Sequence, residues 1–207
     1  ALGAQRGALV VLDARDGGLL AAASQPATFP APGGPAPPAL AKSYAPGSIM
    51  KMLTLSAALR GGVDVDGLFP FDCVGWEAID GIAFRDWMTH RRVASIDEAV
   101  AVSCNLVFGR LGRIVGRDRL DAELRRYGLV GRAGTEAGGG PSDFKFEVGA
   151  LLAEDGAHPE FALARRAEGL DSLELTPIGA ALLAAGLARG GSPPVPTVPS
   201  KSPGVVP

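Results

Sequence analysis

Two proline-rich stretches limit where regular structure can form in this chain. Residues 26–46 hold seven prolines, and the last 16 residues, 192–207, hold six. Proline lacks the backbone N–H that helix interiors and central strands require. We therefore expect an extended loop over 26–46, an extended tail over 192–207, and one packed domain that spans 1–191.

The rest of the chain carries ordinary signals for strands and helices. Residues 7–24 are predicted to form a β-hairpin, because two apolar runs flank a turn that contains Asp16 and two glycines. Residues 63–94 show no clear period and are expected to be irregular, and 131–142 are expected to be a Gly-rich loop. Five helices are predicted: from Ser48 to Gly61, from the Ser95–Glu98 capping box, from 105, over 118–128, and from Thr176-Pro177 to Gly190.

Length and charge narrow the functional classes. A chain of 207 residues fits one domain with a sizeable core. The net charge of −2 and the lack of a basic cluster argue against nucleic-acid binding. No apolar run approaches the length of a membrane span. The chain begins at Ala1 without a signal peptide, so we read it as a processed or excised piece.

Cys73 and Cys104 are the only cysteines. They are too few for a disulfide scaffold, and no metal-ligand spacing surrounds them, so neither a metal nor another cofactor is expected. They either pair in an oxidising compartment or remain buried free thiols. His90, in a polar stretch flanked by arginines, is expected to be structural.

The stretch YAPGSIMKML, residues 44–53, contains the first candidate for chemistry. The chain has 16 arginines and only four lysines, and one of these, Lys51, lies three residues after Ser48. Arginine stays protonated in proteins, whereas burial can make a lysine neutral. Side chains three residues apart share a helix face, so a neutral Lys51 can take the proton of Ser48 and leave a nucleophile. The alternative role for Ser48 is an ordinary helix N-cap.

The segment AVSCNLVF, residues 101–108, is the second candidate. Asn105, the only asparagine of the chain, follows Ser103 by two residues. Positions i and i+2 do not share a helix face, so both side chains can reach one site only if two helices are joined here. The alternative is a helix-to-helix turn that Asn105 simply caps.

Other catalytic patterns are weaker. The chain has two histidines, His90 and His158, and no serine lies in a G-x-S-x-G motif, which argues against a Ser-His-Asp triad. A second Ser-x-x-Lys, from Ser142 to Lys145, lacks the Pro-Gly lead-in and is interpreted as chance. The acidic residues of 118–123 are expected to form a solvent-exposed helix face.

The two motifs together resemble a known family. Pro-Gly-Ser-x-x-Lys, followed 55 residues later by Ser-x-Asn, resembles the penicilloyl serine transferases. Most of the chain is similar to the transpeptidase domain of penicillin-binding proteins. The segments that carry the resemblance are GALVVLDARDGGLLAAAS, YAPGSIMK, SIDEAVAVSCNLVFGRLG and LELTPIGAALLAAGLARGG. The implied fold is α+β and helix-rich, of the transpeptidase/β-lactamase type, with an N-terminal β-hairpin and the C-terminal half of the usual antiparallel sheet missing.

The resemblance also implies roles for four residues. Ser48 would be the acylated nucleophile and Lys51 its general base, while Ser103 would pass the proton to the leaving amine. Asn105 would hold the substrate peptide and Lys51. The implied partners are the D-Ala-D-Ala stem peptides of peptidoglycan, or the β-lactams that mimic them. This chemistry takes place outside the cytoplasm, in the periplasm or at the cell surface, with any membrane anchor outside this chain.

The chain departs from the family pattern at one motif. The third motif, Lys-Thr/Ser-Gly on a strand, is echoed only from Lys201 to Gly204, where a proline interrupts it. Acylation is therefore expected to be slow or absent unless another chain or a C-terminal segment completes the sheet. The hairpin is expected to pair with another polypeptide or to be covered by helices such as 177–189, with the tail outside the sheet.

Two other functions remain open. The first is a non-catalytic binding or scaffolding module of cell-wall synthesis. The second, a β-lactamase, is disfavoured because the sequence contains no Glu-x-x-Leu-Asn stretch.

Overall fold

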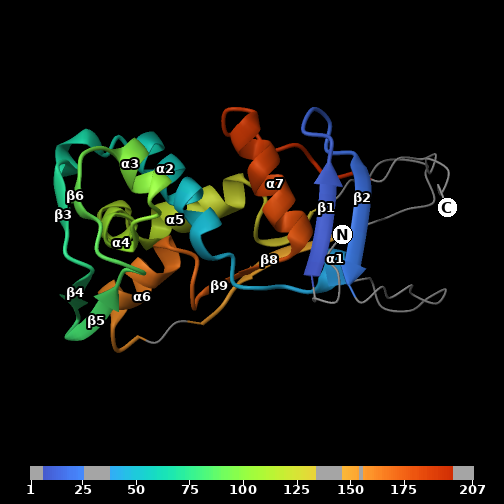
Figure 1. Cartoon of the computed structure of the whole chain (residues 1–207). Helices are drawn as coiled ribbons and strands as arrows, with labels where there is room; N and C mark the ends of the chain where they lie inside the picture. Colours follow the sequence, from blue (N-terminus) through green and yellow to red (C-terminus); the bar gives the residue numbers. More distant parts are fainter. Residues whose placement is uncertain (1–6, 26–37, 134–145, 154–155, 198–207) are drawn as a thin grey trace. The chain divides into compact units, whose positions relative to one another are not determined.

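The structure is a computed structural model, and it describes residues 7–25, 38–133, 146–153 and 156–197. The chain divides into two compact units, whose elements are labelled in Figure 1. The domain boundary expected at residue 191 stays a prediction. The first unit contains Ala1–Tyr44, Arg126–Ala150 and Leu175–Pro207, and the second contains Ala45–Arg125 and Leu151–Glu174.

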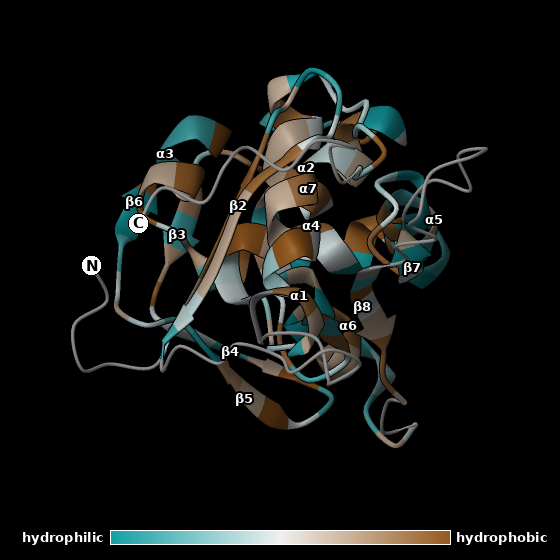
Figure 2. Cartoon of the chain, turned by 90° about the vertical axis from the view of Figure 1, so that its right-hand side faces the viewer, coloured by the Kyte–Doolittle hydropathy of each residue, from teal (hydrophilic) through white to brown (hydrophobic). Residues whose placement is uncertain are grey.

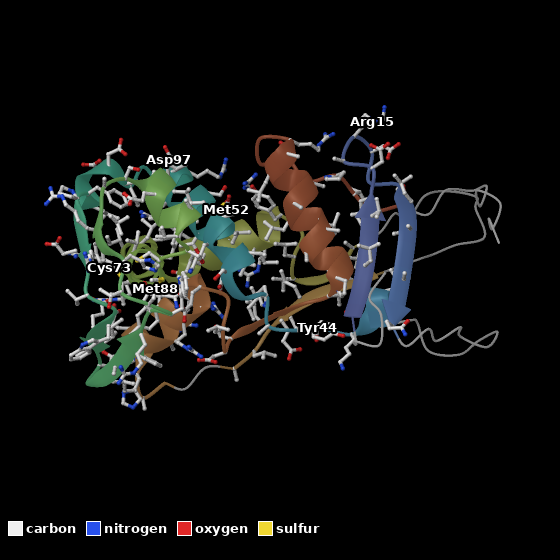
Figure 3. The ribbon with its side chains drawn as sticks, viewed as in Figure 1. Arg15, Tyr44, Met52, Cys73, Met88 and Asp97 are labelled. Carbon is white, nitrogen blue, oxygen red and sulfur yellow. The ribbon has the colours of Figure 1, made fainter. Side chains whose placement is uncertain are left out.

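The hairpin of the first unit forms as predicted. Strand β1 (Gly7–Leu12) pairs antiparallel with β2 (Leu19–Gln25). In the connecting turn, Asp16 Oδ1 accepts a hydrogen bond from the Gly18 N–H at 2.8 Å. Figure 3 shows Arg15 at the tip of this turn. The Asp and Gly residues thus supply the turn chemistry that the sequence indicates.

Helix α7 (Pro177–Ala188) packs against the hairpin. It begins as the Thr-Pro pair predicts, because Thr176 Oγ1 accepts a hydrogen bond from the Gly179 N–H at 3.2 Å. The helix contacts β1, so one of the two expected ways of covering the hairpin is present. The cover is partial, since Leu9 and Leu20 remain 54% and 55% exposed.

In the described part of the tail, residues 192–197, no strand joins the hairpin sheet, as expected, but one residue forms a bridge beside it. Thr197 donates its N–H to Gly17 O at 2.9 Å and accepts a hydrogen bond from the Leu19 N–H at 2.8 Å. These bonds form an isolated parallel bridge with Gly18. Thr197 has the N–H that a proline lacks, so this residue can pair even though no continuous strand forms. Residues 198–207, which include the echo of the third motif, lie outside the described residues.

The other four predicted helices are also present in the structure. The capping box of Ser95 closes as expected: Ser95 Oγ accepts from the Glu98 N–H at 3.2 Å, while Glu98 Oε2 accepts from the Ala94 N–H at 2.7 Å. Among the helices of the described residues, none is long and apolar enough to cross a membrane. The four helices are α2 (Met50–Arg60), α3 (Ile96–Ala101), α4 (Asn105–Val115) and α5 (Arg117–Arg126).

The expectation that residues 63–94 are irregular is wrong. Strand β3 (Phe71–Cys73) pairs antiparallel with β6 (Arg91–Val93), and β4 (Trp76–Ile79) pairs antiparallel with β5 (Ile82–Arg85). Each strand has only three or four residues, which is too short to display a period of two. Their buried side chains join the core of the second unit: Phe71, Cys73, Ile79, Phe84 and Val93.

Several further elements carry no clear sequence signal. The expected Gly-rich loop at 131–142 begins instead with a strand, and its remaining residues, like the second Ser-x-x-Lys, lie outside the described residues. The additional elements are α1 (Pro38–Ala41), β7 (Gly131–Ala133), β8 (Phe146–Leu151), α6 (Pro159–Ala167) and β9 (Leu173–Leu175). Strands β7 and β8 pair antiparallel.

The acidic residues of α5 do not all face solvent, although the helix is largely hydrophilic (Figure 2). Glu123 is 4% exposed, and its Oε1 accepts a hydrogen bond from Ser56 Oγ of α2 at 2.6 Å. Asp121 forms an ion pair with the buried Arg166 of α6. The expected solvent-exposed acidic face is therefore wrong at two positions, because these carboxylates bind α5 to its neighbours.

Helices α4 and α6 approach each other closely because small residues line their contact. A Cβ atom at Gly112 would lie 2.2 Å from Ala167 Cβ, and one at Gly109 would lie 2.6 Å from the Phe84 ring. Protein interiors are close-packed, so neither position has room for a larger side chain. The spacing of these two helices depends on the glycines.

We expect Gly112→Ala to destabilise the protein by about 1–2 kcal/mol. An overlap at 2.2 Å falls in the upper part, about 2–3 kcal/mol, of the cost of overpacking. The gain in helix propensity of about 1 kcal/mol offsets only part of it. Urea denaturation followed by circular dichroism measures the change. The double variant Gly112→Ala/Ala167→Gly reopens the space and should recover part of the loss. Gly156→Ala, where an added Cβ meets no atom within 4 Å, is the control. An unchanged midpoint for Gly112→Ala would contradict the packing argument.

Candidate active site

Ser48 lies on a tight turn that precedes α2. This 3-10 turn spans Gly47–Ile49, and Ser48 is exposed within it. The Ser48 hydroxyl accepts a hydrogen bond from Ser103 Oγ at 3.1 Å, and neither the turn nor α2 has a side-chain N-cap. Ser48 is therefore not an ordinary helix cap, and its hydroxyl is both accessible and directed to a second predicted site residue.

The loop that follows α6 packs on this turn. The Gly47 N–H donates to Gly169 O at 2.9 Å. Gly169 has φ of +84°, and a Cβ atom there would lie 2.2 Å from Gly47 O. Only glycine combines a left-handed backbone with such a close approach. The loop that carries Glu168 is thus fixed against the turn that carries Ser48.

Ser103 and Asn105 approach from the turn between α3 and α4. Ser103 has φ of +54°, a left-handed conformation that residues other than glycine rarely adopt. Its N–H donates to Val100 O at 3.1 Å, while the Cys104 N–H donates to Ala99 O at 3.0 Å. The turn ends one helix and begins the next at Asn105. The expectation that two separate helices are joined here is confirmed, and a simple Asn cap is excluded.

Lys51 is the centre of the site. Its side chain is 2% exposed, and Nζ lies 2.6 Å from Ser103 O, 2.9 Å from Ser103 Oγ and 2.6 Å from Asn105 Oδ1. Asn105 Nδ2 donates to Arg85 O at 3.3 Å, which orients the amide. Nζ also lies 5.7 Å from the centre of the Phe108 ring. The structure therefore brings together all four residues that the sequence indicates.

The three partners of Lys51 set the direction of proton transfer. Ser103 O and Asn105 Oδ1 can only accept hydrogen bonds, whereas a serine hydroxyl can donate or accept. A neutral amine has two N–H groups and one lone pair. In the structure Lys51 Nζ donates to Ser103 Oγ, and Ser103 Oγ donates to Ser48 Oγ. When the amine is neutral, its two N–H groups can stay on the two oxygens that only accept, and its lone pair then faces the Ser103 hydroxyl. Both hydroxyl bonds can then reverse, so that Ser103 donates to Lys51 and accepts the hydrogen of Ser48.

The surroundings of Lys51 favour this neutral state. Burial lowers the pKa of the Lys51 ammonium below its ordinary value, and the negative charges of Glu168 and Asp86 oppose that shift. Desolvation disfavours the charged form of any amine, while a nearby carboxylate favours it. The lowered pKa gives Lys51 a larger fraction of neutral amine, with a free lone pair, than an exposed lysine has at the same pH.

Glu168 is a buried acidic residue whose charge acts on Lys51, and the sequence does not reveal it. It is 3% exposed, and in the part of the chain that the structure describes its Oε2 has no hydrogen-bond partner. Burial raises the pKa of Glu168 to about 7, against the opposing charges of Arg165 and Lys51. Its neighbour Gly169 is one of many glycines, and no short motif surrounds the pair.

Comparison with known proteins assigns the chain to a family. Residues 7–203 match the family described as penicillin binding protein transpeptidase domain. The chain belongs to this family of penicillin-binding transpeptidase domains. No curated protein matches the sequence closely enough to serve as a relative.

Solved structures of penicillin-binding proteins from M. tuberculosis share the fold. Penicillin-binding protein A, as a ceftriaxone acyl-enzyme complex, is 24% identical with a TM-score of 0.72, covering 92% of this chain and 47% of that chain. Penicillin-binding protein 3 with ampicillin is 23% identical with a TM-score of 0.74, covering 95% and 43%. The apo form of the latter is 22% identical with a TM-score of 0.73, covering 95% and 44%. This chain thus spans less than half the length of these solved chains. The α+β transpeptidase fold is confirmed.

The raised pKa of Glu168 predicts that stability falls as the pH rises. Between the ordinary carboxyl pKa of 4.5 and about 7, the folded protein holds a proton that the unfolded chain releases. Folding stability therefore decreases across this window, by at most about 3 kcal/mol. Glu168→Gln keeps the shape without the ionisation, so its free energy of unfolding should not show this decrease. Urea denaturation at pH 4.5 and pH 7.5 measures the difference between the two proteins.

A second carboxyl provides the control for that experiment. Glu160→Gln makes the same chemical change at a side chain that is 52% exposed. Its pH dependence should follow that of the unmodified protein. Parallel pH curves for Glu168→Gln and the unmodified protein would contradict the proposed proton uptake.

The left-handed conformation of Ser103 gives a further prediction. Ser103→Ala and Ser103→Gly both remove the hydroxyl, but only glycine relieves the backbone strain. The glycine variant should therefore be more stable than the alanine variant by about 1 kcal/mol. Thermal or urea denaturation of the two variants side by side measures this difference. Equal stabilities would show that the turn is not strained at this residue.

Proposed function

We propose that the chain is a serine acyl-transfer domain of the D,D-transpeptidase type, which forms an acyl-enzyme at Ser48 with the D-Ala-D-Ala ends of peptidoglycan stem peptides. The observation that carries the proposal is the hydrogen-bonded path from Ser48 Oγ through Ser103 Oγ to Lys51 Nζ. Membership of the penicillin-binding transpeptidase family supports the same chemistry.

Acylation would proceed along that path. Ser48 Oγ bonds to the carbonyl carbon of the penultimate D-Ala while its proton passes to Ser103, and Ser103 passes its own proton to neutral Lys51. The proton then returns through Ser103 to the leaving amine, the peptide bond breaks, and the terminal D-Ala departs. An acceptor amine attacks the resulting ester and restores Ser48. Asn105 holds Lys51 during these steps, and its contact with the substrate peptide is part of the proposal.

β-Lactams are proposed to acylate the same serine, because their amide carbonyl presents the same target. Acyl-enzyme complexes of penicillin-binding protein A from M. tuberculosis with ceftriaxone, penicillin G and imipenem support this idea for a chain of the same fold. Stem peptides are exposed outside the cytoplasm, so the proposed location is extracytoplasmic, in the periplasm or at the cell surface.

Labelling with a fluorescent penicillin tests the proposal. We expect a covalent adduct at Ser48, identified by peptide mass spectrometry and absent from Ser48→Ala. Lys51→Arg keeps a positive charge but has no basic nitrogen. Its labelling rate should fall by about 100-fold or more, the range typical of a lost general base. Labelling of the unmodified chain is expected to be slow, because the third motif is echoed only imperfectly in the sequence.

Lys42→Arg is the matched control, because Lys42 is an exposed lysine beside Tyr44 in the other unit. It should label like the unmodified chain, and circular dichroism establishes that each variant is folded. A folded chain that never labels would favour the non-catalytic module of cell-wall synthesis. Unchanged labelling of Lys51→Arg would exclude Lys51 as the base.

A further inference from the structure

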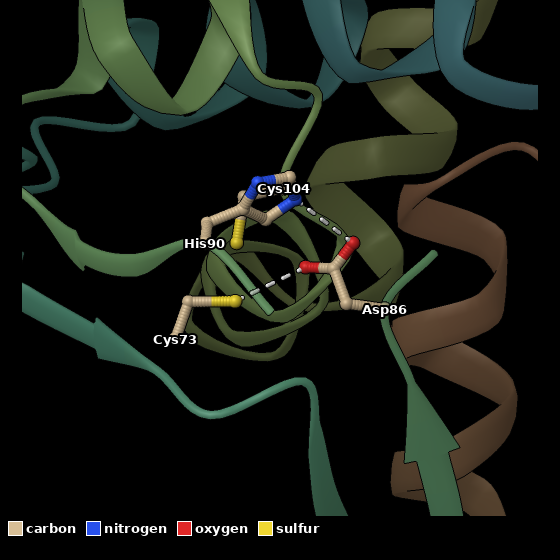
Figure 4. Close-up of side chains that lie close together, drawn as sticks. All are labelled: Cys73, Asp86, His90 and Cys104. Carbon is tan, nitrogen blue, oxygen red and sulfur yellow. Dashed lines mark hydrogen bonds and ion pairs between the residues drawn. The ribbon is translucent and has the colours of Figure 1, made fainter. Parts of the chain in front are cut away.

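Four side chains with metal-binding atoms meet behind the turn that carries Ser103 and Asn105. They are Cys73 at the end of β3, Asp86 after β5, His90 before β6 and Cys104 before α4, as Figure 4 shows. One ligand atom of each lies within 4.8 Å of the ligand atoms of the other three. None of them has a role in the proposed acyl transfer.

The cluster is buried, and one of its polar groups lacks a partner. The side chains of Asp86 and His90 are 0% and 5% exposed, and both cysteines are buried free thiols. His90 Nε2 lies 3.4 Å from Asp86 Oδ1, yet among the described residues it has no hydrogen-bond partner. A buried polar atom without a partner costs free energy, so such an atom calls for an explanation such as an ion.

Asp86 links the other members of the cluster. Cys73 Sγ donates to Asp86 Oδ2 at 3.4 Å, and the Leu106 N–H donates to the same oxygen at 3.4 Å. The Trp87 N–H holds the other oxygen at 2.8 Å. These contacts fix the carboxylate with its oxygens toward the thiol and the imidazole, which is the orientation that a shared cation requires.

We propose that Cys73, Asp86, His90 and Cys104 bind one divalent, thiophilic cation, for which Zn²⁺ is the best chemical match. Two sulfurs, one imidazole nitrogen and one carboxylate oxygen are the ligand types that tetrahedral zinc takes in structural sites. With metal–ligand bonds of about 2.0–2.3 Å, tetrahedral ligand atoms lie about 3.3–3.8 Å apart. The present cluster needs a contraction of only about 1 Å to reach that geometry. On binding, each thiol releases its proton to solvent and the Nε2 of His90 supplies its lone pair.

A disulfide between Cys73 and Cys104 is the competing arrangement for the two thiols. It would satisfy both sulfurs but would leave His90 Nε2 without a partner. A cation satisfies all four groups at once. The unpartnered imidazole in the same cluster is the observation that favours the metal.

The proposed ion would link segments of the second unit that are far apart in the sequence. Its ligands come from four separate segments, and two of these segments belong to the paired strands β3 and β6. Cys104 lies directly between Ser103 and Asn105, while Asp86 follows Arg85, whose carbonyl binds the Asn105 amide. The ion therefore ties the small strands of 71–93 to the turn between α3 and α4.

Cobalt binding to the full chain tests the site without reference to catalysis. The protein is reduced, freed of metal under anaerobic conditions and titrated with Co²⁺. We expect one equivalent to bind, with the visible bands of tetrahedral cobalt and a thiolate-to-cobalt charge-transfer band, and we expect Zn²⁺ to displace it and raise the melting temperature. A folded, reduced chain without a cobalt–thiolate spectrum would overturn the proposal. So would a Cys73–Cys104 disulfide in the isolated protein that binds no metal after reduction.

Matched variants assign the ligands. His90→Gln and Asp86→Asn should each weaken Zn²⁺ binding by about tenfold or more. Removing a group that only hydrogen-bonds to a metal ligand already costs about that much affinity, and removing a ligand itself should cost at least as much. His158→Gln and Asp72→Asn make the same chemical changes outside the cluster and should bind like the unmodified chain. Equal Zn²⁺ affinity for His90→Gln and His158→Gln would exclude His90 as a ligand and overturn the four-ligand site. If His90→Gln or Asp86→Asn fails to fold, the cobalt spectrum of the unmodified chain still decides the question.

Discussion

The burial of the Lys51 amine is the constraint on which the rest of the site depends. An amine removed from water is costly unless its hydrogen bonds are replaced. Here one turn supplies all three replacements, the carbonyl and hydroxyl of Ser103 and the amide oxygen of Asn105. A continuous helix could not present these groups together, because residues two apart point in different directions. The break between α3 and α4, and the left-handed backbone of Ser103, are the structural consequences of burying this one lysine.

The same turn is connected to Ser48 through the packing of the second unit. Helix α4 begins at Asn105 and packs on α6 through Gly112 and Ala167. The loop after α6 then places Gly169 against the backbone of Gly47, beside Ser48. The turn that contacts Lys51 and the turn that carries Ser48 are therefore positioned by one continuous series of close contacts. Both contacts require a glycine, Gly112 in the first and Gly169 in the second. The distance between Ser48 and Ser103 is therefore set by packing rather than by local helix propensity.

The sequence predicts those parts of this arrangement that depend on local chemistry. The hairpin turn, the Ser95 and Thr176 caps and the helices with a clear period all follow from short-range signals, and the two motifs identify Ser48, Lys51, Ser103 and Asn105. Segments without such signals are missed. The strands of 71–93 are too short to show a period, and α6 is found only in the structure. Glu168 and the cluster around His90 acquire their properties from burial by distant segments, which no local pattern records.

The turn of Ser103, Cys104 and Asn105 has two faces. One face contacts Lys51, and the other carries the buried thiol of Cys104. Ser103 and Asn105 contact Lys51, whereas Cys104 lies 0% exposed among Cys73, Asp86 and His90. A shift of the backbone at residue 104, caused by metal binding or oxidation in that cluster, would move both neighbours. The Ser103 carbonyl is itself a partner of Lys51 at 2.6 Å, so such a shift would change the surroundings of the amine. The positions of Ser103 and Asn105 at Lys51 therefore depend on how firmly Cys104 is held in its cluster.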